Sequence, residues 1–279
     1  MRRILEVARL TLHEASRRRI LLAMLLCGVA FLVVYSIGIH FVIRDFDRQT
    51  GVRVAVEKRM FLTFCTLAGL YAVNFLLVMT AVLLPVDALS GEISSGVMQT
   101  LAARPIRRSE IVLGKWIAYA VLVAGYLTFM VSGVLAIVRL RGGYTPPNVA
   151  IGFPLMLLEG VVLVTLAIAG GAKLSTVTNG VMAFGFYGLA FVANWVEQIG
   201  TMFGNQAARN VGTVASLIMP TESLWMLAAS HMQPPMMRDL GMTPFSPVAV
   251  PTNAMVVWAF VHIAVVLALG VNAFRKRPL

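Results

Sequence analysis

The chain has 279 residues, of which 59% are hydrophobic and only 13% are charged. Average soluble domains are roughly 45–50% apolar and about 25% charged, so this composition excludes an ordinary water-soluble protein. A net charge of +11 is compatible with nucleic-acid binding. However, the basic residues lie at the ends of apolar runs and no basic helix or aromatic-basic strand follows them, so we expect no nucleic-acid partner.

Residues 1–19 are predicted to form an amphipathic helix at the membrane surface. A polar stripe recurs at intervals of three or four residues and comprises Arg2, Glu6, Arg9, His13 and Arg17. An apolar stripe lies on the opposite face and comprises Ile4, Ala8, Leu12 and Ala15. Such a helix lies in the interface with its basic face among anionic headgroups, so membrane lipid is an expected partner. The alternative is a charged leader that only orients the first span.

Six stretches with at most one charged residue are long enough to cross a membrane. The hydrocarbon core is about 30 Å thick and needs roughly 20 apolar residues in a helix. The predicted spans are 20–43, 60–86, 116–138, 149–172, 174–196 and 254–274. The first is long and rich in bulky side chains, so we interpret it as a retained span rather than a cleaved signal peptide.

The segment 200–253, between the fifth and sixth spans, is predicted to be an external connection with one or two short helices. Its prolines are Pro220, Pro234, Pro235, Pro244, Pro247 and Pro251. A seventh span over 211–230 would contain Pro220 and Glu222, and it would place the basic C-terminal tail outside. We therefore expect an external helix there. With no repeat and no linker, the chain is expected to be one membrane domain.

The distribution of basic residues favours a topology with both termini in the cytoplasm. The inside segments then hold more than half of the 23 basic residues, mostly at the two termini. The first external loop is the exception, because five basic residues crowd there: Arg44, Arg48, Arg53, Lys58 and Arg59.

The most informative segment lies between the second and third spans. Ile93, Val97 and Leu101 fall four residues apart, which predicts one apolar ridge on a short helix. Arg104 and Pro105 end that helix, because proline disfavours helical geometry in the residue before it. Ser109 is predicted to cap the start of the next helix.

This segment, residues 88–110, and the start of the next span resemble the first cytoplasmic loop of the type-2 ABC (ABC-2) export permeases. The matching positions are Glu92, Gly96, Leu101, Pro105, Ile106, Arg108, Gly114 and Lys115. Arg107 departs from the pattern, since the family often has a small polar residue there. The overall layout is similar to the family over the whole chain, most of all to the group that includes the nitrous oxide reductase maturation permease.

The resemblance implies an all-α membrane protein with six transmembrane helices and an N-terminal interfacial helix. It also implies a cytoplasmic coupling helix between spans two and three and a helical external segment between spans five and six. The coupling helix would dock on a separate ATPase. The implied contact residues are Glu92, Ile93, Gly96, Val97, Met98, Leu101, Arg104, Pro105 and Arg108. A second contact is expected at the turn after Lys173.

By the same resemblance, the chain is a permease subunit of an ATP-binding cassette exporter in the bacterial cytoplasmic (inner) membrane. Two ATPase copies would carry ATP and Mg, and a second permease chain would complete a dimer. No Gly-x-x-x-x-Gly-Lys-Ser/Thr motif occurs in the sequence, so we expect no enzyme activity and no cofactor in this chain.

The sequence does not favour a metal site. The four histidines are scattered without ligand spacing: His13, His40, His231 and His262. Met232, Met236, Met237 and Met242 lie near His231 and suit Cu(I), but methionine is also adaptable apolar filler, which is the preferred interpretation.

Asn74 and Glu159 are predicted to lie in the middle of spans two and four. A charge at that depth costs at least about 2.5–3.5 kcal/mol, so Glu159 must face a partner, water or a path. One interpretation is a translocation path or proton relay. The other is an interhelical hydrogen bond or a dimer contact.

Two alternative functions stay open at this point. An ion-coupled secondary transporter would work through Glu159 without any ATPase, although it usually has two related halves, which are not evident here. A non-transporting membrane scaffold would show no nucleotide-dependent change. An ATPase that copurifies in equal amount would separate the three.

Overall fold

The computed structural model describes residues 2–48, 51–94, 107–239 and 250–277, and these residues contain helices and turns but no strand. The elements are α1 (Arg2–Ala15), α2 (Arg19–Asp47), α3 (Val52–Leu83), α4 (Ser90–Ser94), α6 (Arg108–Gly142), α7 (Val149–Gly171), α8 (Thr176–Met202), α9 (Gln206–Ile218), α10 (Thr221–His231), α11 (Pro235–Asp239) and α12 (Ala254–Lys276).

Six of these helices are long and apolar enough to cross a membrane: α2, α3, α6, α7, α8 and α12. They confirm the predicted fold class. The helices extend past most of the predicted limits; α3, for example, begins at Val52 rather than at residue 60. The predicted limits mark where charges interrupt the apolar run. A helix can continue into the interface, where such charges are hydrated.

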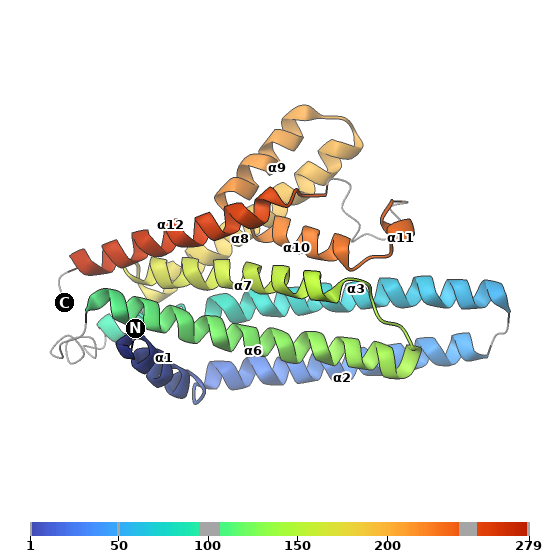
Figure 1. The fold of residues 1–279 in the computed structure, drawn as a ribbon, viewed down its shortest axis with the longest axis horizontal. Helices are drawn as coiled ribbons and strands as arrows, with labels where there is room; N and C mark the ends of the chain where they lie inside the picture. Colours follow the sequence, from blue (N-terminus) through green and yellow to red (C-terminus); the bar gives the residue numbers. More distant parts are fainter. Residues whose placement is uncertain (1, 49–50, 95–106, 240–249, 278–279) are drawn as a thin grey trace.

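Helices α2, α3, α6 and α7 run beside one another along the longest axis of the molecule, and α8 and α12 run obliquely to them (Figure 1). Helix α7 is the most enclosed, with 67% of its most apolar 18-residue stretch buried, against 6% for α2. The exposed face of α2 carries large apolar side chains such as Leu22, Val34 and Phe41. Because such a face would be unfavourable in water, it is suited to lipid or to another membrane subunit.

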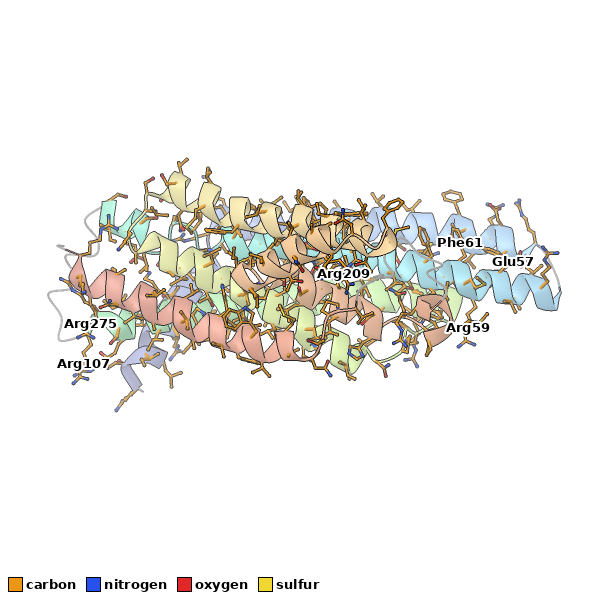
Figure 2. All side chains as sticks on the ribbon, turned by 90° about the horizontal axis from the view of Figure 1, so that it is seen from above. Glu57, Arg59, Phe61, Arg107, Arg209 and Arg275 are labelled. Atoms are coloured by element: carbon orange, nitrogen blue, oxygen red, sulfur yellow. The ribbon has the colours of Figure 1, made fainter. Side chains whose placement is uncertain are left out.

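Both termini lie at the same end of the bundle, which we call the terminal end (Figure 1). Figure 2 shows Arg107 and Arg275 at this end and Glu57 and Arg59 at the opposite end. This separation of charges along the long axis fits a bundle that crosses a membrane.

Helix α1 packs against the first turns of α6. Ala8, Thr11 and Ala15 are buried, whereas Leu5 and Leu10 are exposed. The two backbones approach closely at Gly114 of α6, where an added methyl group would lie 2.7 Å from Val7 and 2.9 Å from the carbonyl oxygen of Ile4. Part of the predicted apolar stripe therefore covers protein rather than lipid.

The stretch 211–230 was expected to be an external helix, within a connection of one or two short helices, and in the structure it is divided between two helices. It contains parts of α9 and α10, which meet at an angle of 103°. Met219 is extended and Pro220 follows it, as the steric restriction on the residue before proline requires. The chain therefore changes direction at this point.

Helix α10 lies inside the bundle, which the sequence did not predict. Most of its residues are buried, including Trp225, and it packs against α7 and α8. Met232, just after α10, contacts Gly152, and the amide of Asn148 donates to the carbonyl oxygen of His231 at 3.3 Å. The C-terminal end of α10 is thus held beside the start of α7.

The predicted cap of α6 is also corrected. The helix begins one residue before Ser109, and Arg107 is its N-cap. The backbone N–H of Arg107 donates to the Glu110 carboxylate at 2.8 Å. Glutamate at the third helical position can satisfy a free N–H group at the start of a helix in this way.

Candidate functional site

The terminal end brings together α1, α4, the start of α6, the α7–α8 turn and the end of α12. A set of polar contacts joins these elements, and we call it the terminal network. It consists of the contacts made by the side chains of Arg18, Asp87, Ser90, Glu92, Arg108, Lys115, Thr176, Asn179 and Arg277. Two of the predicted coupling residues, Glu92 and Arg108, belong to it.

The contact between Glu92 and Lys115 joins α4 to α6. The Lys115 Nζ donates to Glu92 Oε1, and the two side chains are only 4% and 12% exposed. Ile93, the next residue, packs against the main hydrophobic core. A buried ion pair of this kind is strongly destabilised when one partner is removed. Residue 92 is therefore fixed relative to the start of α6.

Arg18 joins the link between α1 and α2 to the residues that follow α3. Its guanidinium donates to Asp87 Oδ1 at 2.5 Å and to Glu14 Oε1 at 2.7 Å. Burial disfavours the charged guanidinium, but the hydrogen bond to Glu14 and the neighbouring Asp87 carboxylate raise the pKa of Arg18 above its ordinary value. The side chain stays charged and holds the two segments together.

Helix α8 is attached to the same region through its first turn. The hydroxyls of Ser90 and Thr176 lie 2.9 Å apart. The fully buried amide of Asn179 donates to the carbonyl oxygens of Val86 at 3.0 Å and Ala167 at 2.8 Å. One side chain thus connects α8 to α7 and to the segment before α4.

Arg108 and Arg277 secure the end of α12. The last carbonyl groups of a helix have no partner within it. Arg108 Nη1 donates to the carbonyl oxygens of Arg275 at 3.1 Å and Arg277 at 2.6 Å, with a longer contact to Phe274. The guanidinium of Arg277 in turn donates to the carbonyl oxygen of Ala172, at the α7–α8 turn, at 2.8 Å.

Three of the predicted coupling residues, Glu92, Ile93 and Arg108, lie in the described part of the chain. The others lie outside it: Gly96, Val97, Met98, Leu101, Arg104 and Pro105. Site prediction missed Arg18, Asp87, Asn179 and Arg277 as partners. Lys115 could have been predicted to have a partner, because a charge just before an apolar run needs an opposite charge or water. Nothing in the sequence indicates that the partner is Glu92.

Asn74 and Glu159 meet in the interior of the bundle, away from the terminal network. The Asn74 amide donates to Glu159 Oε1 at 3.2 Å, and the two residues are 2% and 0% exposed. This is the interhelical hydrogen bond that the structural interpretation expected. Glu222 of α10 lies near enough to Glu159 to interact with it electrostatically.

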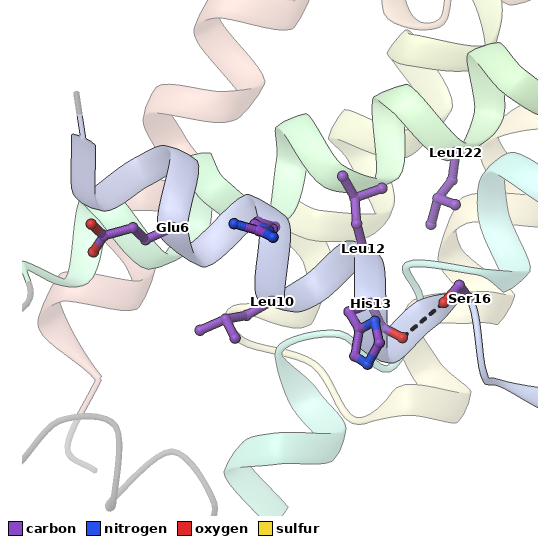
Figure 3. Close-up of a pocket in the computed structure, with 7 residues that line it drawn as sticks. Glu6, Leu10, Leu12, His13, Ser16 and Leu122 are labelled. Carbon is purple, nitrogen blue, oxygen red and sulfur yellow. Dashed lines mark hydrogen bonds between the residues drawn. The ribbon is translucent and has the colours of Figure 1, made fainter.

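A groove of about 840 Å³ lies along α1. Figure 3 shows Glu6, Leu10 and His13 on α1 and Leu122 on α6 around it. Arg9, Leu12 and Ser16 complete the lining. Basic and apolar side chains side by side suit the headgroup and upper chain of a lipid.

Comparison with curated proteins finds no match to this chain, so the narrower resemblance to the nitrous oxide reductase maturation permease group stays a prediction. A family model described as ABC-2 family transporter protein matches residues 8–279, almost the entire chain. The protein therefore belongs to the ABC-2 family of transporter proteins.

Proposed function

We propose that this chain forms the translocation path of an ATP-driven exporter and is moved by a separate ATPase that docks at residues 88–110. Family membership supports a multi-pass permease subunit and implies an ATP-binding cassette ATPase as its partner. The observation that carries the proposal is the terminal network. Near the start of this loop, Glu92 contacts Lys115 of α6, and near its end, Arg108 contacts the end of α12.

In the proposed mechanism, the ATPases bind ATP and Mg and close, which displaces the loop at the terminal end, here assigned to the cytoplasm. The displacement passes from α4 to α6 through Glu92 and Lys115, and to α8 through Ser90 and Thr176. It passes to α12 through Arg108. A switch of this kind needs packed elements that move as units, and the network provides the connections among them.

The proposed assembly contains two permease chains, identical or closely related, and two ATPases. The sparsely buried helices α2, α8 and α12 expose apolar faces that lipid or a second chain would cover. Asn74 and Glu159 are enclosed within one chain. For these two residues to line a path, α10 would have to move away from α7.

The groove along α1 supports the expected contact with lipid. Arg9 and His13 are exposed on the same helix as exposed Leu10, so α1 can place charge at the headgroups and leucine below them. We propose that α1 lies in the cytoplasmic interface while its buried face holds α6.

The test is reconstitution of the purified chain with the ATPase that copurifies with it. We expect an equal amount of ATPase, and hydrolysis whose rate depends on the presence of this chain. A secondary transporter would transport without the ATPase. A scaffold would bind it without changing hydrolysis or transport. Either result would contradict the proposal.

A further inference from the structure

The interior polar cluster contains two buried carboxyl groups on facing helices. Glu159 of α7 is 0% exposed and Glu222 of α10 is 4% exposed. Asn74 of α3 bonds to Glu159, and Tyr187 of α8 lies near enough to Glu222 to interact with it electrostatically. Four helices thus converge on the two carboxyl groups, and α10 closes the cluster.

Within the described residues, neither carboxyl group forms an ion pair with Lys, Arg or His. The titratable groups that interact with them are the phenols of Tyr71 and Tyr187. His231 lies at the other end of α10. On the α12 side, His262 bonds to the carbonyl oxygen of Ile218. Two buried carboxylates without a positive charge would be very unfavourable.

Three oxygen atoms of the cluster have no hydrogen-bond partner: Asn74 Oδ1, Glu159 Oε2 and Glu222 Oε2. The first two belong to groups that are already joined by one hydrogen bond, from the Asn74 amide to Glu159 Oε1. A proton on Glu159 Oε2 would supply the donor that Asn74 Oδ1 lacks. An amide and a carboxylic acid can then pair through two hydrogen bonds instead of one.

We propose that Glu159 and Glu222 form a proton-binding site between α7 and α10, and that the bound proton keeps α10 seated in the bundle. Loss of the proton leaves like charges in a buried space and favours the release of α10. The existing bond from the Asn74 amide to Glu159 Oε1 favours a proton, because a hydrogen on Glu159 Oε2 turns this contact into a two-bond amide–acid pair. Oxygen atoms also bind alkali cations, and the sodium control below separates the two ligands. The inference does not depend on ATPase docking at residues 88–110.

The first test is infrared spectroscopy of the purified protein at neutral pH, with Glu159→Gln, Glu222→Gln and the double variant. We expect a carbonyl band of a protonated carboxylic acid in the unmodified protein and its loss in the double variant. Glutamine keeps the shape of the side chain and supplies a permanent N–H donor. The absence of a band that depends on these two residues would overturn the proposal.

The second test is thermal unfolding across a range of pH in detergent. The unmodified protein should lose stability as the pH rises through the value at which the pair releases its proton, since stability is complete only in the protonated form. The double variant should lose this pH-dependent part and unfold at a higher temperature than the unmodified protein at high pH. Parallel profiles for the two proteins would contradict the proposal.

Two controls keep the result specific. Glu57→Gln removes an exposed carboxylate at the opposite end and should leave the pH profile unchanged. Replacement of sodium by choline at fixed pH should leave the unfolding temperature of the unmodified protein unchanged. A requirement for sodium that the double variant lacks would overturn the assignment of the ligand as a proton.

Discussion

The terminal network and the interior cluster use charged side chains in opposite ways. At the terminal end, Arg18, Glu92 and Lys115 each have an oppositely charged partner within the chain. In the interior, Glu159 and Glu222 have none among the described residues, and each keeps an oxygen without a partner. The first arrangement fixes helices relative to one another. The second leaves a requirement for positive charge that the described residues do not meet.

The largest expected effect comes from breaking the ion pair between α4 and α6. Lys115→Met removes the ammonium group that pairs with the buried Glu92 carboxylate, and we expect a loss of about 3–5 kcal/mol in the free energy of unfolding. Unfolding in detergent, followed by thermal or chemical denaturation, measures it. Adding Glu92→Gln should restore part of the loss, since it removes the charge left behind. No recovery in the double variant would contradict the assigned pairing.

The second effect tests the attachment of α1 to the network. Gly114→Ala places a methyl group against Val7 and the backbone of Ile4, so α1 must shift, at a cost of about 1–3 kcal/mol. Gly125→Ala is the matched control in the same helix, because nothing lies within 4 Å of the added group. We expect the control to gain up to about 1 kcal/mol from helix propensity. Equal losses in both variants would show that the close approach is not the cause.

At Arg108 we expect a smaller change in stability and a clearer change in how far ATP hydrolysis depends on this chain. Arg108→Gln removes the donor to the last carbonyl groups of α12, at a cost of about 1 kcal/mol. We expect the ATPase still to bind but its hydrolysis to become less dependent on this chain. The neighbouring Arg107→Gln is the control, because the carbonyl contacts come from Arg108. Unchanged hydrolysis in Arg108→Gln would remove α12 from the proposed route.

The smallest expected effect lies at the opposite end. Arg53 and Glu57 form an exposed ion pair at 3.0 Å with side chains 91% and 50% exposed. Arg53→Gln should change the free energy of unfolding by no more than about 0.5 kcal/mol, because water screens such pairs. A loss of stability as large as that expected for Lys115→Met would contradict the view that charged pairs at the two ends of the bundle differ in their contribution to stability.

The sequence predicted the membrane helices well because length and absence of charge are local properties. It could not predict α10 inside the bundle, since Glu222 is buried only because α10 packs against α7 and α8, and those contacts depend on how the whole chain folds. The sequence also left two interpretations open for Asn74 and Glu159, because it does not show that the two side chains meet across helices. Pro220 was visible as a break, but the direction that the chain takes after a break is set by tertiary packing.

The predicted coupling residues show the same limit. The motif contains Glu92, Arg108 and Lys115, but the pairing of Glu92 with Lys115, and of Arg108 with the carbonyl groups at the end of α12, came only with the three-dimensional arrangement. A charged residue next to an apolar run indicates that a partner or water is needed. The sequence does not indicate which residue will become that partner when the chain folds.

Site-specific photo-crosslinking in the complex with its ATPase tests the central claim most directly. The crosslinking residue is placed at Ser94, exposed at the end of α4, or at Val56, exposed at the opposite end of the bundle. We predict an adduct with the ATPase from position 94 and none from position 56. An adduct from position 56, or none from position 94 while the ATPase copurifies, would contradict docking at the terminal end.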